Sequence, residues 1–301
     1  MSAGRAALGA VALLAVVAGC GDAPAPPREI AYTVVRDGGS SGEIWAMDAD
    51  GRRAVELTAE GGSPAWSPDG TRVAFVSASE ISVMDADGSG VTRLTHDDEP
   101  DAAPAWSPDG TRLAFAHGAG APQIVVIDAK GGNRAEVTRP RRAVADGEPA
   151  WSPDGRLIAF TRVTVTADGK LESTLMTVAP DGGGERVVTL DAAEPAWSPD
   201  GRRIAYASRA ERSLRACFGS CTPGGEIYVV LADGTEPVRL TTSAATDRSP
   251  AWAPDGRNIA FVSDRSDRAA EEYEIWVVGA DGTGLRRLTT NDVWDLDPTW
   301  H

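Results

Sequence analysis

The chain has 301 residues, of which 44 are acidic and 29 are basic, for a formal net charge of −15. Nucleic acids and anionic lipid surfaces bind basic proteins, so this balance argues against both as partners and fits a cationic partner. The length alone suggests about two domains, but a pattern that repeats along the chain predicts a single one.

The first 19 residues have the pattern of a secretory signal. Arg5 precedes an apolar run over residues 6–18, which is shorter than the roughly 20 residues that a membrane-spanning helix needs. Residues 17–20 (VAGC) resemble a bacterial lipobox, in which the signal is cleaved before the cysteine and Cys20 is lipidated. An ordinary signal peptide followed by an incidental cysteine is the alternative.

Residues 20–29 begin with that cysteine and are rich in proline, as in a short, semi-extended tether. We therefore expect domain boundaries of 1–19 for the signal, 20–29 for the lipidated tether and 30–301 for the folded region. The protein would be exported and held at a bacterial cell membrane or outer membrane by lipid alone, in the periplasm or on the cell surface.

From residue 30 onward the chain repeats four short strand-like segments, A to D, separated by turns. In the second unit they are residues 64–67, 72–77, 80–85 and 91–95. The absence of helical periodicity between them predicts an all-β fold. The first segment and its turn are almost invariant: PAWSPDG at 64–70, 104–110, 149–155 and 195–201, PAWAPDG at 250–256, and PTWH at 298–301.

The Pro-Asp-Gly sequence after segment A suits a type I turn. Pro68 presets φ, Asp69 can accept local backbone hydrogen bonds, and Gly70 tolerates a positive φ. We interpret the tryptophan of each repeat as a core residue between neighbouring units, with ligand stacking as the alternative. These residues are Trp66, Trp106, Trp151, Trp197, Trp252 and Trp300.

Segments B and C each occur six times, but the first unit has no segment A of its own. Residues 298–301 supply the missing copy. In a closed ring, the last strand of the chain pairs with the first unit and removes the exposed sheet edges. The count predicts a six-bladed β-propeller of four-stranded antiparallel blades, closed three-plus-one by residues 298–301.

The repeats also resemble a known family. The pattern P-x-W-S-P-D-G-x-x-I-A-F, followed by I-Y-V-M-D-A-D-G and L-T, is similar to the WD40-like (PD40) repeat of the TolB propeller family, and it extends over residues 30–301. The resemblance implies the same propeller fold and an envelope protein that engages protein partners. The chain differs from TolB itself in having no α/β domain before the propeller and in carrying a lipobox.

Antiparallel strands place the A–B and C–D turns on one face and the B–C and D–A connections on the other. The second face varies in length between units, as functional loops do. Four D–A connections carry an aspartate three residues before the proline, and we expect these to surround the channel mouth: Asp101, Asp146, Asp247 and Asp295, with Glu148, Glu194 and Asp297 nearby. The alternative is that each aspartate caps its own turn.

An oxygen-only ligand set of this kind suits calcium better than zinc. Calcium at Asp101, Asp146, Asp247 and Asp295 is therefore an expectation, although no cofactor is required. A lysine or arginine of a partner peptide would fill the same site.

The two remaining cysteines, Cys217 and Cys221, are four residues apart in a long B–C connection. We expect a disulfide, which suits an oxidising compartment. A metal site is the alternative, but no histidine or further cysteine lies near them in the sequence.

No catalytic constellation is evident. Residues 38–42 (GGSSG) match G-x-S-x-G but lie in a hairpin loop, and the only histidines are His96, His117 and His301. We expect a monomeric binding platform that holds an envelope protein or peptide through the B–C and D–A face. The alternative is a hydrolase or lyase with a carboxylate-bound divalent metal at the channel mouth.

Overall fold

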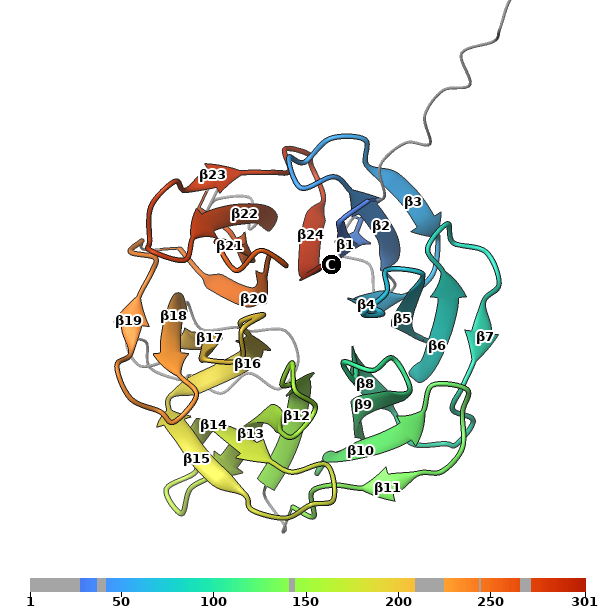
Figure 1. Ribbon diagram of the computed structural model, residues 1–301, viewed down its shortest axis with the longest axis vertical. Coiled ribbons are helices and arrows are strands. Elements are labelled where there is room, and N and C mark those ends of the chain that lie inside the picture. The colour runs from blue at the N-terminus through green and yellow to red at the C-terminus, as the bar shows by residue number, and fades with distance from the viewer. Residues whose placement is uncertain (1–27, 37–41, 141–143, 209–224, 244, 266–271) are drawn as a thin grey trace, which may run out of the picture.

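The computed structural model describes residues 28–36, 42–140, 144–208, 225–243, 245–265 and 272–301. Six four-stranded antiparallel sheets surround a central channel, as the blades of a propeller (Figure 1). The predicted fold is therefore confirmed. Within the described ranges, no helix is long and apolar enough to cross a membrane.

The strands of each blade run from the channel outward in the order A to D. Blade 1 contains β24 (Trp294–Trp300), β1 (Ile30–Val35), β2 (Glu43–Met47) and β3 (Val55–Thr58). Blade 2 contains β4 (Gly62–Trp66), β5 (Arg72–Ser77), β6 (Glu80–Asp85) and β7 (Thr92–Arg93). Blade 3 contains β8 (Asp101–Trp106), β9 (Arg112–His117), β10 (Gln123–Asp128) and β11 (Ala135–Glu136). Blade 4 contains β12 (Val144–Trp151), β13 (Ile158–Val165), β14 (Leu171–Val178) and β15 (Arg186–Leu190). Blade 5 contains β16 (Ala192–Trp197), β17 (Arg203–Ser208), β18 (Glu226–Leu231) and β19 (Val238–Arg239). Blade 6 contains β20 (Asp247–Trp252), β21 (Asn258–Ser263), β22 (Glu274–Gly279) and β23 (Arg286–Arg287).

The ring closes where β24 pairs with β1. Ile30 lies opposite Trp300 and Ala31 opposite Thr299, and the pairing continues to Val35 opposite Trp294. The closing strand is thus longer than the expected 298–301, because strand A begins several residues before its proline.

The Asp-Gly turn behaves as its sequence predicts. Asp69 Oδ1 accepts hydrogen bonds from the Ser67 hydroxyl (2.6 Å) and from the backbone N–H of Thr71 (3.1 Å), and Gly70 has a φ of 66°. These bonds lower the pKa of Asp69 to about 2, led by the one from Ser67. The turn needs no ligand to explain it.

The hydrophobic core lies between the blades. Trp106 of blade 3 packs with Ala74 and Ile81 of blade 2 and with Leu113 of its own blade. Its indole N–H donates to the Ala65 carbonyl oxygen of blade 2 at 3.1 Å. Each tryptophan of this kind joins its blade to the preceding one, which accounts for its recurrence.

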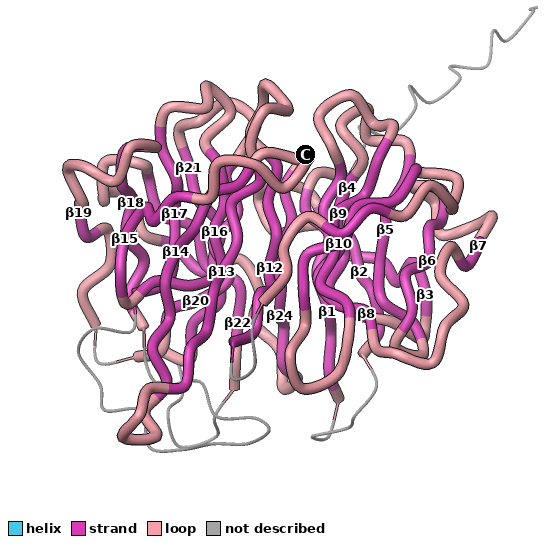
Figure 2. The backbone as a smooth tube through the Cα atoms, turned by 90° about the horizontal axis from the view of Figure 1, so that it is seen from below, coloured by secondary structure: helices cyan, strands magenta, loops and turns pink. Residues whose placement is uncertain are grey.

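The two faces differ in their connections. Because neighbouring strands are antiparallel, the short Asp-Gly turns lie on the face that also carries the C-terminus, here called the turn face. The B–C and D–A connections lie on the opposite loop face (Figure 2). The shortest B–C connection, Ala78-Ser79, turns with two positive φ values, 49° and 62°.

Candidate functional site

Each innermost strand contains a β-bulge next to its proline. In β8, for example, the pairing with β9 shifts between Ala102 and Ala105. The residue before the proline takes a left-handed φ of 49° to 57° in all six blades, although none is glycine: Ser63, Ala103, Glu148, Glu194, Ser249 and Asp297. Such backbone is costly for residues with a Cβ, so its recurrence marks a position that the fold maintains.

All six bulge residues line a cavity of about 370 Å³ at the loop-face end of the channel. Three of them are carboxylates, Glu148, Glu194 and Asp297, and all three are half-buried. Together with Ser63 and Ser249 they form what we call the acidic mouth. Of the seven acidic residues expected here from the sequence, these three are the ones that the structure brings to the channel.

Hydrogen bonds between blades connect the acidic mouth. Glu148 Oε2 accepts from the Thr161 hydroxyl (2.6 Å) and from the backbone N–H of Glu194 (2.9 Å). Glu194 Oε2 in turn accepts from the backbone N–H of Ser249 at 2.6 Å. The hydroxyls of Ser249 and Ser63 each lie 3.4 Å from an oxygen of Asp297. Backbone N–H groups of the next blade thus hold Glu148 and Glu194, whereas Asp297 contacts only serine hydroxyls in these bonds.

One cation borders the same cavity. Arg248 lines it, and its guanidinium lies 4.9 Å from the centre of the Tyr273 ring. Its Nε is buried and has no hydrogen-bond partner. Among the described residues that line the cavity, three carboxylates against one guanidinium give a net negative charge.

The four aspartates expected to surround the mouth lie elsewhere, which corrects the expectation. Asp101, Asp146, Asp247 and Asp295 are 0% to 2% exposed and do not line the cavity. The reason is that strand A starts at or before each of them, as β8 does at Asp101. The bulge then follows, and it is the residue two positions later that faces the channel.

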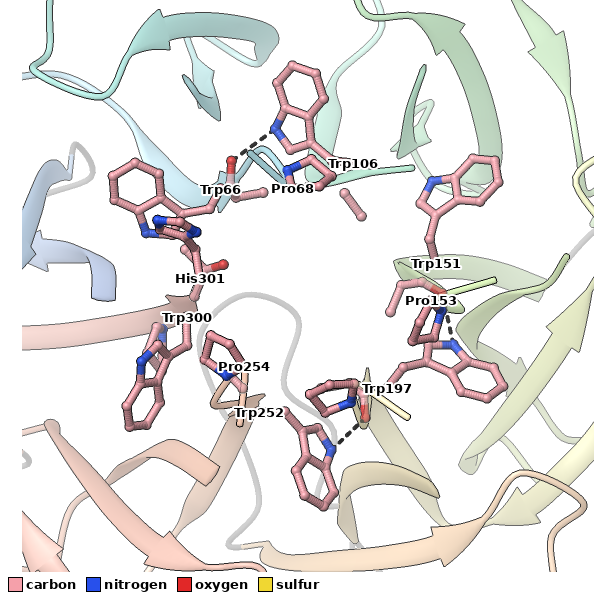
Figure 3. Close-up of a pocket in the computed structure, with 18 of the residues that line it drawn as sticks. Trp66, Pro68, Trp106, Trp151, Pro153, Trp197, Trp252, Pro254, Trp300 and His301 are labelled. Carbon is pink, nitrogen blue, oxygen red and sulfur yellow. Dashed lines mark hydrogen bonds between the residues drawn. The ribbon is translucent and has the colours of Figure 1, made fainter. Parts of the chain in front are cut away.

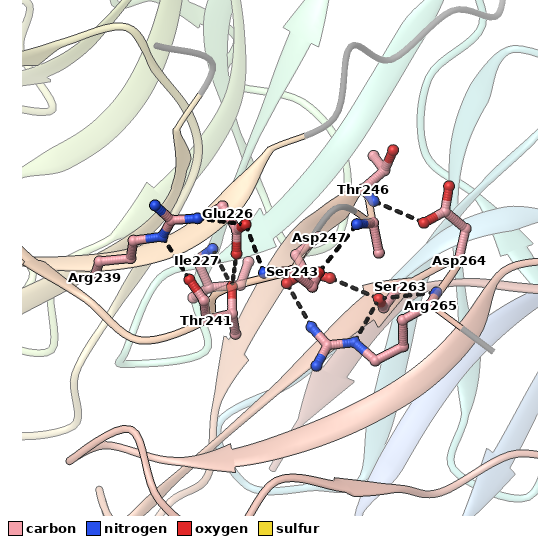
Figure 4. Close-up of polar contacts among 11 residues, drawn as sticks. Glu226, Ile227, Arg239, Thr241, Ser243, Thr246, Asp247, Ser263, Asp264 and Arg265 are labelled. Carbon is pink, nitrogen blue, oxygen red and sulfur yellow. Dashed lines mark hydrogen bonds and ion pairs between the residues drawn. The ribbon is translucent and has the colours of Figure 1, made fainter. Parts of the chain in front are cut away.

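Each aspartate instead contacts side chains that lie on the strands of its own blade or directly beside them. Asp101 contacts His117 Nδ1 at 2.7 Å, and Asp146 binds Arg162 through two bonds of 2.7 and 2.8 Å. Asp247 accepts from Ser263 (2.6 Å) and Arg265 (2.5 Å), as Figure 4 shows. The four do not come within ligand distance of one another. A calcium ion shared by them is therefore not supported.

Asp295 forms no ion pair with any residue that the structure describes. Its Oδ2 accepts from the Asn291 amide at 2.8 Å, whereas its Oδ1 is buried without a partner. Burial raises the pKa of this carboxyl to about 7, despite hydrogen bonds from Thr289 and Asn291, and the nearby Glu274 adds to the rise.

The turn-face end of the channel has a different character. A cavity of about 510 Å³ is lined there mainly by the repeated Pro-Ala-Trp segments and by further prolines such as Pro153 and Pro254 (Figure 3). The tryptophans before the Asp-Gly turns are only 5% to 9% exposed, and Trp300 is half-buried. The indoles therefore serve the core and present little stacking surface. His301 lies against Trp66, with ring centres 5.3 Å apart.

Other expected positions lie outside the described residues. These are Cys20, the Cys217 and Cys221 pair, and most of the GGSSG loop. His96 is exposed on a D–A connection and belongs to no group of convergent metal ligands in the described part of the chain.

Comparison with known proteins agrees with the propeller fold. Residues 23–219 match the family described as the TolB beta propeller domain. No curated protein matches the chain. Among solved structures, a putative TolB from Agrobacterium tumefaciens is 22% identical, with a TM-score of 0.66 over 87% of this chain and 88% of that one. TolB from Acinetobacter baumannii is 20% identical, with a TM-score of 0.72 over 91% of this chain and 66% of that one.

The propeller fold is also shared with proteins of other kinds. A chain of a nidogen/laminin complex is 10% identical (TM-score 0.67, 90% of this chain and 97% of that one). An oligogalacturonate lyase in complex with manganese is 17% identical (TM-score 0.56, 82% and 70%). At these identities the likeness shows the fold alone. The family match, which includes more than half of the chain, shows that this protein belongs to the TolB β-propeller domain family.

Proposed function

We propose that this protein is an exported binding platform whose acidic mouth holds a basic side chain of a peptide or protein partner. The observation that carries the proposal is the placement of Glu148, Glu194 and Asp297 on left-handed bulge positions around one cavity. The bulge itself is a feature of the fold, since it recurs in all six blades, but the gathering of carboxylates at three of its six positions around one cavity is not required by the bulge.

The mouth is suited to a cation before any ligand arrives. The Glu148 and Glu194 carboxylates accept backbone N–H groups from the next blade, so little ordering is left for a ligand to drive. A channel with low-dielectric walls focuses the field of like charges at its opening, which raises the local concentration of a cationic partner. The net charge of −15 acts in the same direction.

The dimensions favour a protruding side chain over a folded surface. A cavity of about 370 Å³ is at the small end of the range for ligand pockets, and it admits one or two side chains. The partner would insert a lysine or arginine among the carboxylates, while its neighbouring residues contact the loop face. That a propeller of this fold occurs in a complex of nidogen with laminin is compatible with a protein partner.

The proposal includes membrane attachment through Cys20. A lipid there, followed by the Pro-rich tether, would keep the propeller close to the bilayer. Cys20→Ala should abolish labelling by an alkynyl fatty acid and leave the signal uncleaved, as judged by gel mobility. Labelling that persists in the variant would rule out this anchor but would leave the binding site untouched.

A hydrolase or lyase with a divalent metal at the mouth is the second candidate, and the manganese-bound lyase of similar fold favours it. The oxygen ligands of Glu148, Glu194 and Asp297 suit a hard cation such as calcium. Turnover of polyuronide, ester or lactone substrates that a chelator abolishes would support this candidate against the binding platform.

In-cell photocrosslinking tests the platform. A photoreactive residue at Ala103, the bulge position with an apolar side chain, should capture a defined protein partner. The capture should disappear when Glu148, Glu194 and Asp297 become their amides. The matched control is the same photoreactive residue at Asp109, in an exposed Asp-Gly turn of the opposite face, which should capture nothing in common with Ala103. Capture at Ala103 that the amide substitutions leave unchanged would contradict the proposal.

A further inference from the structure

Three potential metal ligands meet on the loop face at the start of blade 3, apart from the acidic mouth. They are Asp97 in the connection between blades 2 and 3, Asp101 at the start of β8, and His117 at the end of β9. One ligand atom of each lies within 4.8 Å of the other two. No other group of this kind occurs among the described residues.

The imidazole nitrogen lies between two carboxylates. His117 Nδ1 is 2.7 Å from Asp101 Oδ1 and 3.9 Å from Asp97 Oδ1. Around a tetrahedral zinc ion with bonds of roughly 2.0 Å, ligand atoms are about 3.3 Å apart. Both distances therefore reach that value by shifts of about 0.6 Å, within the range of a side-chain adjustment.

The ligands are supported as metal ligands usually are. Asp97 Oδ2 accepts a hydrogen bond from Arg134 at 2.7 Å, and its Oδ1, the oxygen on the side of His117, accepts one from the backbone N–H of Glu99 at 3.2 Å, so both bonds orient the carboxylate toward the site. Asp101 is 2% exposed, and its Oδ2 has no hydrogen-bond partner. A buried carboxylate with an unpartnered oxygen is costly, so Asp101 is a carboxylate that gains from a cation beside it.

Comparison between blades shows what is particular to this site. His117 occupies in β9 the position that Arg162 occupies in β13, each opposite the buried aspartate of its strand A. Arg162 binds Asp146 with two hydrogen bonds but, being a permanent cation, cannot ligate a metal. In blade 3 the same position carries an imidazole, which can.

We propose that Asp97, Asp101 and His117 bind a divalent first-row transition metal of the zinc class, which links the connection between blades 2 and 3 to the innermost strands of blade 3. One nitrogen and two carboxylate oxygens suit zinc better than calcium or magnesium, which prefer oxygen alone. The Asp97 side chain is 39% exposed and that of His117 is 12% exposed, so the site faces solvent on the Asp97 side. Water can therefore take the fourth position.

The test is a titration of the purified protein, with its thiols blocked so that the cysteines cannot take up metal. Zinc should bind with one equivalent at micromolar protein concentration. Cobalt should give the visible absorption of a four-coordinate site, which reports ligation and not merely stabilisation. Calcium and magnesium at the same concentration should not compete.

His117→Arg is the informative variant, because it recreates the ion pair of blade 4 and should fold. It should weaken zinc binding by about 100-fold or more, since loss of even a supporting residue costs 10- to 100-fold. Asp97→Asn, at an exposed position, should do the same.

The matched control is His96→Gln, one residue before Asp97, which should bind zinc as the wild type does. Zinc binding that survives His117→Arg, binding that is lost equally in His96→Gln, or no uptake of zinc at all would each overturn the proposal. None of these outcomes bears on the acidic mouth.

Discussion

The Glu148 carboxylate of blade 4 accepts a 2.9 Å hydrogen bond from the backbone N–H of Glu194 in blade 5, so the side chain at one bulge holds the backbone of the next. The same oxygen accepts from the Thr161 hydroxyl at 2.6 Å. The acidic mouth therefore helps to join the blades. A substitution that tests its charge must keep the hydrogen bonds between the blades.

Glu148→Ala should lower the free energy of unfolding by about 1 kcal/mol, because the N–H of Glu194 loses its carboxylate acceptor and keeps the Thr161 hydroxyl at 3.0 Å. Glu148→Gln keeps an acceptor oxygen at the same place and should cost less than half as much. Urea unfolding followed by tryptophan fluorescence measures both. Equal losses in the two variants would mean that the hydrogen bond contributes little and that charge alone matters.

Asp295 should make stability depend on pH. Its pKa in the folded protein, about 7, lies above the ordinary value of 3.8, chiefly because of burial. The folded state therefore binds the proton more tightly than the unfolded state does. The stability that this group contributes is complete below pH 4 and is lost as the pH rises toward and through 7.

Asparagine cannot ionise, so Asp295→Asn removes the loss of stability at high pH while it keeps the shape of the side chain. It should raise the free energy of unfolding relative to the wild type at pH 8, by an amount on the order of 4 kcal/mol at most. At pH 4 the two proteins should differ little. Thermal or urea unfolding across this range gives the difference directly, and a difference that stays constant from pH 4 to pH 8 would contradict the assignment.

Closure of the ring should be essential for stability. Deletion of residues 298–301 removes the strand pairs of Ile30 with Trp300 and of Ala31 with Thr299, and it exposes Ile30, which is fully buried. We expect a loss of about 3 kcal/mol or more, together with association through the open edge of β1. Thermal melting and size-exclusion chromatography measure the two effects.

Removal of His301 alone is the control for that deletion. It keeps the strand pairs of β24 and gives up the ring contact with Trp66 and one backbone hydrogen bond, from the His301 N–H to the Glu29 carbonyl oxygen, so its melting temperature should fall only slightly. Unchanged melting and an unchanged monomer after deletion of 298–301 would show that the pairing is dispensable.

The sequence predicts the fold well because each repeat contains the residues that specify its turn and its packing against the next blade. Pro68, Asp69 and Gly70 specify a turn through local backbone preferences, and Trp66 recurs wherever one blade packs on another. Counting six copies of strands B and C against five complete copies of strand A is enough to infer closure by residues 298–301.

The site was harder to predict because a bulge is not visible in an alternating pattern. The expectation placed Asp101 in a D–A connection, whereas it already belongs to β8 and pairs with His117. Glu148, Glu194 and Asp297 were included only as neighbours of the aspartates. The signal that could have identified them, and Ser63 and Ser249 with them, is their shared position directly before the proline.

Long-range partners were also beyond the reach of the sequence. Nothing in the local pattern places Arg162 against Asp146, or leaves Asp295 without an ion pair among the described residues, since these depend on which residue of strand B lies opposite or near each aspartate. The cluster of Asp97, Asp101 and His117 likewise forms only when β8 and β9 pair.

Binding of basic peptides by the acidic mouth is the measurement that tests the proposed function most directly. Short fluorescent peptides that carry a central lysine or arginine would be compared, by anisotropy, with the same peptides carrying glutamine at that position. The wild type should bind the basic peptides selectively and more weakly as salt increases, because screening acts on the mouth. The variant with Glu148→Gln, Glu194→Gln and Asp297→Asn should lose the selectivity while remaining folded, with a melting temperature only slightly below that of the wild type. Equal binding of basic and glutamine peptides by the wild type, or selectivity that the triple variant retains, would contradict the account.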